Sequence, residues 1–359
     1  MNKLKKIAIF LPSIGYGGAE MSLIRIANYL ASNNIKVHLI VSKSVENQLD
    51  SIDESLIEVE YLNSKKTFLS FFKLYKKVNE INPDILFSTL PTPNFLVVLL
   101  SYLQLINVKV IIREANSNYI NWKGGLKNFI NKRMAIFAFN NSHGNIFISN
   151  ELKNNVSIFI KNENNIVIYN PVYVRNFHEL SNEKVHEFKK TKELWLTASR
   201  IEEQKGLNIF FDVVEDLKKE KDFEVLAIGA GSKLNEYREK YSELPITFLG
   251  NVKNPLKFMK IADVFVFPSI REGLGNSLIE AQILGLPIIS SDCPSGPKEI
   301  VNLFSNGIIF ESRNKDDLMI KAKDIVGKEK VTVNKKIVQN FDVQKVGKRY
   351  LGFFESILN

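Results

Sequence analysis

Cysteine is almost absent from this chain of 359 residues, in which Cys293 is the single one. An internal disulfide and a cysteine-based zinc site are therefore excluded, and a reducing compartment, by default the cytoplasm, is expected. Long hydrophobic runs are also missing, because the longest apolar stretch, residues 95–106, is interrupted by Ser101 and Gln104. It falls short of the roughly 20 residues that a membrane-spanning helix needs.

The dinucleotide-binding fingerprint is missing as well. The first predicted strand, residues 7–11, leads into Gly15, Gly17 and Gly18, whose spacing is not Gly-x-Gly-x-x-Gly, and no acid follows the second strand to hold a ribose. This counts against a nicotinamide-dependent oxidoreductase. The turn still opens a helix, whose free backbone N–H groups favour an anion. A purely structural use of these glycines is the alternative.

The chain contains 45% hydrophobic and 24% charged residues, as an ordinary globular protein does. Short β-rich runs alternate with helical patterns, which is typical of βαβ units and parallel sheets. Strands are predicted at residues 7–11, 37–41, 85–88, 108–112, 145–148 and 166–168, and after a pause at 194–198, 223–228, 246–249, 264–266, 288–290 and 307–309.

The pause divides the chain into two doubly wound, Rossmann-like α/β domains, residues 1–175 and 187–342, facing each other across a cleft. Asn170-Pro171 is a turn signal at its start. A helix over residues 343–359 has an apolar side and is expected to pack back on the first domain. Ligands of such sheets bind beyond the carboxyl ends of the strands.

Positive charge is unevenly distributed. The net charge is +9, and residues 1–180 hold 20 lysines and arginines against 13 acidic residues, so that +7 of it lies in the first half. A basic excess suits nucleic acid, an anionic membrane or an anionic substrate, or it serves solubility alone. Charge does not choose among these.

Basic residues follow the first strand of the second half. Arg200 lies just past the predicted strand 194–198, and Lys205-Gly206 precedes a helix. A guanidinium fork and a mobile ammonium suit the two phosphates of a diphosphate. The alternative is a solvated basic loop.

Two glutamates flank a glycine-bearing loop after the predicted strand 264–266. Glu272 begins Glu-Gly-Leu-Gly-Asn, and Glu280 lies one turn inside the following helix. The helix N-terminus favours a phosphate, Glu272 is placed for a sugar, and Glu280 for ribose hydroxyls. Ser277 and Glu280 also have capping-box spacing, in which the glutamate serves only the helix. The later segment from Asp292 to Ile300 is either a further part of the site or a tight connection.

Four motifs in order resemble those of the retaining nucleotide-sugar glycosyltransferases of the GT-B fold, of the family 4 or group 1 type. They are Gly-Gly-Ala-Glu after the first strand, Arg200 with Lys205-Gly206, the pair Glu272 and Glu280, and Asp-Cys-Pro-x-Gly-Pro-x-Glu-Ile. The resemblance covers nearly the whole chain. It implies a metal-independent transfer from a nucleotide diphosphate sugar with no cofactor and with the anomeric configuration kept.

The resemblance also implies roles for individual residues. Arg200 and Lys205 would hold the diphosphate and stabilise the leaving nucleotide, and Glu272 would bind the transferred sugar. The remaining donor-binding residues would be Gly17, Gly18, Asn251, Val252, Gly273, Leu274, Gly275, Asn276 and Glu280. Where many family members have a histidine or acid near the reacting carbon, this chain has Arg113 and Glu114, which would contact the acceptor or the sugar. The absence of an evident nucleophile fits a front-face mechanism.

The family's first domain receives the acceptor, often on a membrane lipid, which gives the basic half a use. Two segments mix aromatics with cations, namely Lys65, Lys66, Phe68, Phe71, Phe72, Lys73, Lys76 and Lys77, and Trp122, Lys123, Lys127, Phe129, Ile130, Lys132 and Arg133. Such clusters hold a protein on an anionic leaflet without insertion. Alternatively, the aromatics lie in the core and the lysines are solvated.

The expected function is transfer of a hexose or N-acetylhexosamine from a UDP-sugar to a saccharide acceptor. The resemblance to bacterial surface-polysaccharide enzymes, of capsule or O-antigen, favours a polyprenyl-diphosphate-linked acceptor and the cytoplasmic face of the inner membrane. A sugar-nucleotide epimerase of the same fold is the alternative. A basic nucleic-acid-binding protein is less favoured, because no helix-turn-helix, zinc or RNA-stacking motif is present.

Overall fold

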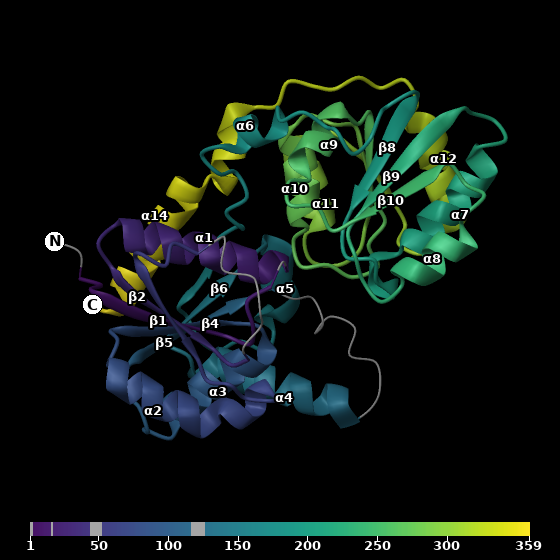
Figure 1. Cartoon of the computed structure of the whole chain (residues 1–359). Coiled ribbons are helices and arrows are strands. Elements are labelled where there is room, and N and C mark those ends of the chain that lie inside the picture. The colour runs from purple at the N-terminus through teal and green to yellow at the C-terminus, as the bar shows by residue number, and fades with distance from the viewer. Residues whose placement is uncertain (1–2, 16, 44–51, 116–125) are drawn as a thin grey trace. The chain divides into compact units, whose positions relative to one another are not determined.

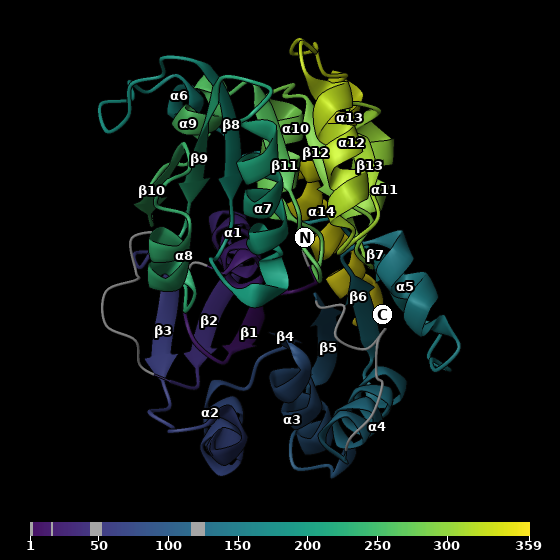
Figure 2. The ribbon, with the colours of Figure 1, turned by 90° about the vertical axis from the view of Figure 1, so that its right-hand side faces the viewer.

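The computed structural model describes residues 3–15, 17–43, 52–115 and 126–359. The chain divides into unit 1, Met1–Pro171 with Asn340–Asn359, and unit 2, Val172–Gln339. Figures 1 and 2 label their helices and strands. Trp122 and Lys123, from the second aromatic and basic segment, lie outside the described residues. No helix within the described ranges is long and apolar enough to cross a membrane.

Unit 1 is built on a parallel sheet in the order β3-β2-β1-β4-β5-β6-β7. The strands are β1 (Lys6–Leu11), β2 (Lys36–Val41), β3 (Ile57–Tyr61), β4 (Ile85–Thr89), β5 (Lys109–Glu114), β6 (Gly144–Phe147) and β7 (Asn165–Val167). The helices are α1 (Gly18–Ser32), α2 (Phe71–Ile81), α3 (Pro91–Tyr102), α4 (Leu126–Asn141), α5 (Asn150–Ser157) and α14 (Val343–Ile357), with the 3-10 turn η1 (Thr67–Ser70). Figures 1 and 2 show α2, α3 and α4 on one face of this sheet and α1 and α14 on the other.

Unit 2 has a parallel sheet in the order β10-β9-β8-β11-β12-β13, which is the doubly wound order. The strands are β8 (Glu193–Ala198), β9 (Phe223–Ile228), β10 (Ile246–Gly250), β11 (Val264–Phe267), β12 (Ile288–Ser291) and β13 (Ile308–Phe310). The helices are α6 (Phe177–Ser181), α7 (Leu207–Leu217), α8 (Leu234–Lys240), α9 (Leu256–Ile261), α10 (Asn276–Ile283), α11 (Pro297–Phe304), α12 (Lys315–Ile325) and α13 (Lys335–Val338). The 3-10 turns are η2 (Glu203–Lys205) and η3 (Gln339–Phe341). The prediction of two doubly wound halves is confirmed.

The C-terminal helix α14 buries its apolar side in unit 1. Tyr350 and Phe354 are fully buried and meet the Phe87 ring edge to face, with centroids 5.9 and 5.1 Å apart. Gly347 lies against the Tyr29 ring of α1, where a Cβ would be 2.3 Å from the nearest ring atom. The chain therefore returns to its first unit after completing the second.

The edge strand β3 was not among the predicted strands. Its sequence alternates between Ile57, Val59 and Tyr61, which pack toward the core, and the polar Glu58 and Glu60. This strand is short and half polar, as edge strands often are, and so its apolar signal is weak.

Candidate active site

A close ion pair joins the two loops that were predicted to bind the donor. Lys205 Nζ in η2 contacts Glu272 Oε2 in the loop after β11, and the side chains are only 11% and 17% exposed. Ser269 Oγ donates to the same carboxylate oxygen over 3.3 Å. A largely buried lysine with a carboxylate partner is not a solvated basic loop, so that alternative is wrong for Lys205. The structure brings together the predicted phosphate-binding and sugar-binding side chains.

Gly206 allows these loops to approach. It follows β8 and η2, it has φ +62°, and a Cβ on it would lie 2.1 Å from the carbonyl oxygen of Pro268. The backbone N–H of Ile270 also donates to the Gln204 carbonyl over 2.9 Å. Because β8 and β11 are neighbours in the sheet, their carboxyl ends meet at one edge, and the contact between their loops follows from the topology.

Arg200 precedes Lys205 in the same loop after β8, and its side chain is exposed. Among the residues described, its guanidinium makes no hydrogen bond or ion pair. The neighbouring Glu202 instead accepts hydrogen bonds from Ser232, 3.0 Å from the backbone N and 2.7 Å from Oγ. These bonds, with a smaller contribution from Arg200, lower the pKa of Glu202. The Arg200 fork is therefore available to an anion.

Helix α10 begins at the predicted place but without the predicted cap. Gly275 is its N-cap with φ +82°, and no side chain caps the first turn. Ser277 lies inside the helix and not at the N-cap, so the capping-box interpretation of Ser277 and Glu280 is wrong. Gly273, Leu274 and Asn276 lie at this N-terminus, with Glu280 one turn inside. Backbone N–H groups at a helix start favour an anion.

Sequence reasoning missed the support beneath Glu272. Ser295 Oγ donates to the backbone carbonyl of Glu272 over 2.8 Å, and Ser295 has a left-handed φ of +87°. Strained positions of this kind often accompany functional sites. The sequence signal for this support is the Pro294-x-Gly296-Pro297 turn, which fits either a tight connection or a further part of the site. The structure shows that this turn holds the Glu272 loop.

Asn251 and Val252 follow β10 at the same carboxyl edge of the sheet. Asn251 is exposed and Val252 is half-buried. Gly250 accepts a hydrogen bond from the backbone N–H of Gly229 over 2.8 Å, which ties this loop to the end of β9. Their assignment to the nucleobase stays a prediction.

In unit 1, Gly17 is the N-cap of α1 and Gly18 is its first residue. The Glu20 carboxylate folds back over Gly17, where a Cβ would lie 2.2 Å from Oε2. A side chain at this position would only require the flexible Glu20 carboxylate to move, since Gly17 has an ordinary φ of -67°. The Gly17 carbonyl accepts the N–H of Met21 over 3.0 Å, so the turn is ordered as a helix start.

Arg113 and Glu114 end β5 and are buried. The guanidinium of Arg113 donates from Nε to Tyr350 Oη over 3.1 Å, from Nη1 to Thr89 Oγ1 over 3.1 Å, and from Nη2 to Asn170 Oδ1 over 2.5 Å. Arg113 therefore fastens α14 and the segment after β7 to the end of β5. Its predicted contact with acceptor or sugar would need these bonds to be exchanged, and the roles of both residues stay predictions.

A cavity of about 500 Å³ lies at the opposite, amino end of the unit 2 sheet. Its charges are paired locally, since Lys190 contacts Asp263 at 2.6 Å and Lys221 contacts Glu193 at 2.5 Å. It holds none of the predicted donor residues. The carboxyl end remains the candidate active site.

The fold and this site define a GT-B glycosyltransferase, and the comparisons with known proteins agree. The family profile described as Glycosyltransferase Family 4 matches residues 16–175, and that described as Glycosyl transferases group 1 matches residues 179–340. Together they cover both units. The chain belongs to the glycosyltransferases of these two profiles.

Among relatives, an uncharacterized glycosyltransferase of Methanocaldococcus jannaschii is 34% identical over 147 residues, which is 38% of this chain and 36% of that protein. A Campylobacter jejuni enzyme is 23% identical over 99% of this chain and 100% of its own length. Its name is GalNAc-α-(1→4)-GalNAc-α-(1→3)-diNAcBac-PP-undecaprenol α-1,4-N-acetyl-D-galactosaminyltransferase.

Among solved structures, Anabaena HepE in complex with UDP and glucose superposes with a TM-score of 0.76 at 17% identity, over 98% of this chain and 100% of HepE. At this identity the likeness shows the fold alone. It confirms the predicted GT-B class.

Proposed function

We propose that this glycosyltransferase moves a hexose or N-acetylhexosamine from a UDP-sugar to a saccharide carried on a polyprenyl diphosphate, in bacterial surface-polysaccharide synthesis. The anomeric configuration is kept and no metal takes part. The observation that carries the proposal is the contact of Lys205 with Glu272 beside the unpaired fork of Arg200. The donor class and the acceptor follow the names of the similar proteins, which include UDP and an undecaprenol-linked glycan.

In this proposal Arg200 and Lys205 bind the diphosphate. Negative charge grows on the leaving UDP as the bond between the sugar C1 and the phosphate oxygen breaks, and the two cations stabilise it. The N–H groups of Gly273 to Asn276 and the α10 dipole add to this stabilisation. Glu272 holds hydroxyls of the transferred sugar, and Glu280 holds the ribose. Asn251 and Val252 receive the base, and Gly17 and Gly18 receive the diphosphate.

The acceptor hydroxyl attacks C1 from the side on which UDP departs. Its oxygen forms the new bond to C1, its proton passes to the departing phosphate oxygen, and UDP is released. The configuration at C1 is thereby kept without a protein nucleophile. Arg113 and Glu114 would contact the acceptor or the sugar after donor binding rearranges the end of β5, because both side chains are buried in the donor-free chain.

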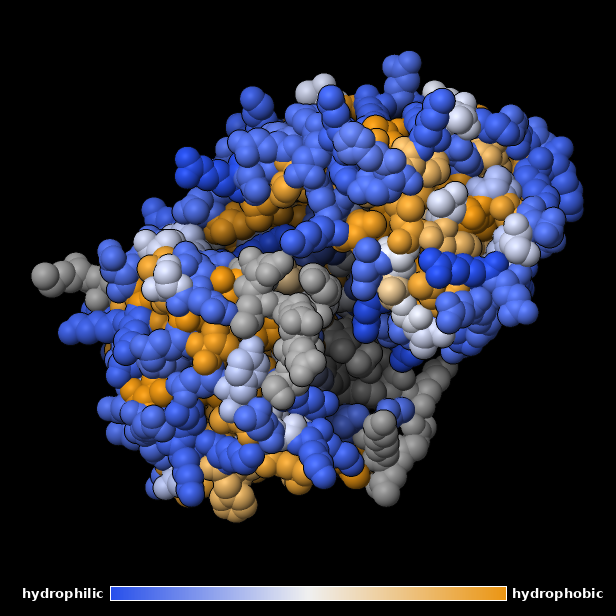
Figure 3. All heavy atoms as spheres, viewed as in Figure 1, coloured by the Kyte–Doolittle hydropathy of each residue, from blue (hydrophilic) through white to orange (hydrophobic). Residues whose placement is uncertain are grey.

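We also propose that the enzyme works on the cytoplasmic face of the inner membrane, and the exposed apolar side chains of unit 1 support contact with a membrane. Among the residues that the structure describes, eight of the thirteen large exposed hydrophobics lie on or beside η1, α2, α3 and α4. They are Phe68, Leu69, Phe72, Tyr102, Leu103, Leu105, Phe129 and Ile130. Phe72 is 74% exposed. The interpretation of Phe68, Phe72 and Phe129 as core residues is therefore wrong. Figure 3 shows hydrophobic atoms among hydrophilic ones around α2.

Cations complement this apolar surface. Lys65, Lys66 and Lys76 are exposed beside Phe68 and Phe72. Near an anionic leaflet each cation contributes about 1 kcal/mol of binding free energy. The three lysines therefore add to the free energy gained by burying the apolar side chains. We therefore propose that the surface formed by η1, α2, α3 and α4 binds the membrane that carries the acceptor.

The test is a screen of UDP-, GDP- and ADP-sugars for nucleotide release, with and without a polyprenyl-diphosphate-linked saccharide. Release that needs a UDP-sugar and the acceptor, and that persists in EDTA, is expected. An altered nucleotide sugar without a new glycoside would instead establish the epimerase alternative.

A further inference from the structure

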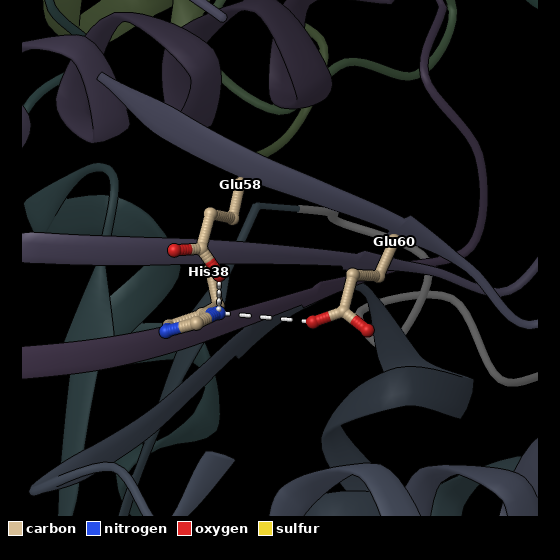
Figure 4. A group of neighbouring side chains, drawn as sticks. All are labelled: His38, Glu58 and Glu60. Atoms are coloured by element: carbon tan, nitrogen blue, oxygen red, sulfur yellow. Dashed lines mark ion pairs between the residues drawn. The ribbon is translucent and has the colours of Figure 1, made fainter. Parts of the chain in front are cut away.

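Three titratable side chains converge on the edge of the unit 1 sheet, far in sequence from the donor loops. His38 lies on β2 directly opposite Glu58 of β3, and Glu60 lies two residues further along the same face. Figure 4 shows the imidazole pointing at both carboxylates. The alternate residues of these strands, such as Val37 and Ile57, pack in the core on the other face.

The three groups present one ligand atom each to a common point. His38 Nδ1 lies 3.1 Å from Glu58 Oε2 and 3.7 Å from Glu60 Oε1. All three atoms lie within 4.8 Å of one another. The tetrahedral shell of a zinc ion, with bonds of about 2.1 Å, has ligand atoms about 3.4 Å apart. A small side-chain adjustment therefore reaches that spacing.

Each carboxylate uses its other oxygen for a lysine. Lys36 Nζ contacts Glu58 Oε1 at 2.9 Å, and Lys77 Nζ contacts Glu60 Oε2. The lysines thus bind one oxygen of each carboxylate, and the other oxygen, Oε2 of Glu58 and Oε1 of Glu60, faces His38. Partners of this kind fix the orientation of metal ligands in known sites.

His38 itself points to a ligand. It is only 5% exposed, and neither ring nitrogen has a hydrogen-bond partner of acceptable geometry among the described residues. Burial, opposed by the charge of Glu58, lowers the pKa of His38. In its neutral form the ring offers a lone pair to a cation. A buried polar atom without a hydrogen bond is costly, and a cation bound at Nδ1 would give that atom a partner.

We propose that His38, Glu58 and Glu60 bind one divalent cation of the zinc class, which ties the edge strand β3 to β2. An imidazole with two carboxylates suits zinc, whereas magnesium and calcium prefer oxygen ligands alone. Water completes the shell, since the Glu58 side chain is 56% exposed. The site is structural and lies in the other unit from Glu272 and Lys205, so it is compatible with a metal-independent transfer.

The experiment uses the full chain without an affinity tag, stripped with EDTA and titrated with Zn²⁺ against a chromophoric chelator. One Zn²⁺ per chain is expected. His38→Gln and Glu58→Gln should each weaken the affinity at least about tenfold, because each removes a ligand. His186→Gln, which changes an exposed histidine of unit 2, should leave the affinity unchanged.

Two further readouts separate ligation from a structural role. Zn²⁺ should raise the thermal unfolding midpoint of the parent chain but not that of Glu58→Gln. The Glu58 side chain is 56% exposed, so this substitution leaves the core unchanged. In spectra of imidazole-labelled protein, Zn²⁺ should shift Nδ1 of His38 and of no other histidine. Absence of stoichiometric uptake, or uptake equal in the parent and in folded Glu58→Gln, would overturn the proposal.

Discussion

Replacing Glu272 by glutamine is expected to strengthen the binding of UDP while it slows sugar transfer. In the donor-free chain Glu272 holds Lys205, so a diphosphate has to compete with this carboxylate for the ammonium. Glutamine keeps the shape of the Glu272 side chain and removes the negative charge that competes with the diphosphate for Lys205. The same change deprives the transferred sugar of a charged hydrogen-bond acceptor, which matters only when the sugar is present.

The magnitudes follow from the exposure of the pair. Two unit charges about 4 Å apart interact by about 4 kcal/mol at an effective dielectric constant near 20, which is a ceiling. The side chains are 11% and 17% exposed, and screening and the loss of the partner's hydrogen bonds reduce the net effect to about 1–2 kcal/mol. UDP should therefore bind about 5- to 30-fold more tightly. Loss of the sugar contact should lower kcat/KM about 10- to 150-fold.

The assay combines calorimetric titration with UDP and a coupled measurement of UDP release during transfer. Lys205→Met should weaken UDP binding at least about tenfold, because it removes a charged phosphate ligand. Glu203→Gln is the matched control, since this exposed carboxylate lies in the same turn, and it should change neither quantity. If Glu272→Gln weakened UDP binding as Lys205→Met does, the competition inferred from the ion pair would be refuted.

Three further outcomes are expected. Tyr350→Phe should lower the free energy of unfolding by about 1–2 kcal/mol in denaturant titrations, because it removes the Nε acceptor of the buried Arg113; an unchanged value would deny that bond a role in stability. Burial, with the charge of Lys109, lowers the pKa of His143 in the folded chain. As the pH falls below about 6.5 the unfolded chain therefore takes up this proton first, and the free energy of unfolding should decline. An equally steep decline in His143→Gln would contradict this cause. Phe72→Asp should reduce binding to anionic liposomes at low salt relative to the buffer-exposed control Ile320→Asp of unit 2, and equal binding by both would remove the proposed membrane surface.

The doubly wound fold was predictable because its inner strands are continuous apolar runs. Buried parallel strands carry that signal in an unbroken run, as β11 does throughout and β1 does after Lys6. The edge strand β3 lacks it, since Glu58 and Glu60 interrupt the run, and its pairing with β2 is visible only in the sheet.

The site was predictable to the extent that glycines and charged residues follow strand ends. Lys205 and Glu272 were identified from sequence, but their contact depends on β8 and β11 being neighbours, which local patterns do not encode. The support from Ser295 depends on the same long-range packing. The burial of Arg113 was also hidden, because Tyr350 comes from the far end of the chain.

The most direct test of the central claim is the anomeric configuration of the product formed from an isotope-labelled α-linked UDP-sugar and a polyprenyl-diphosphate-linked saccharide. The account predicts release of UDP together with an α-glycoside, and loss of both in Lys205→Met. A β-glycoside, or an epimerised nucleotide sugar without any glycoside, would contradict it.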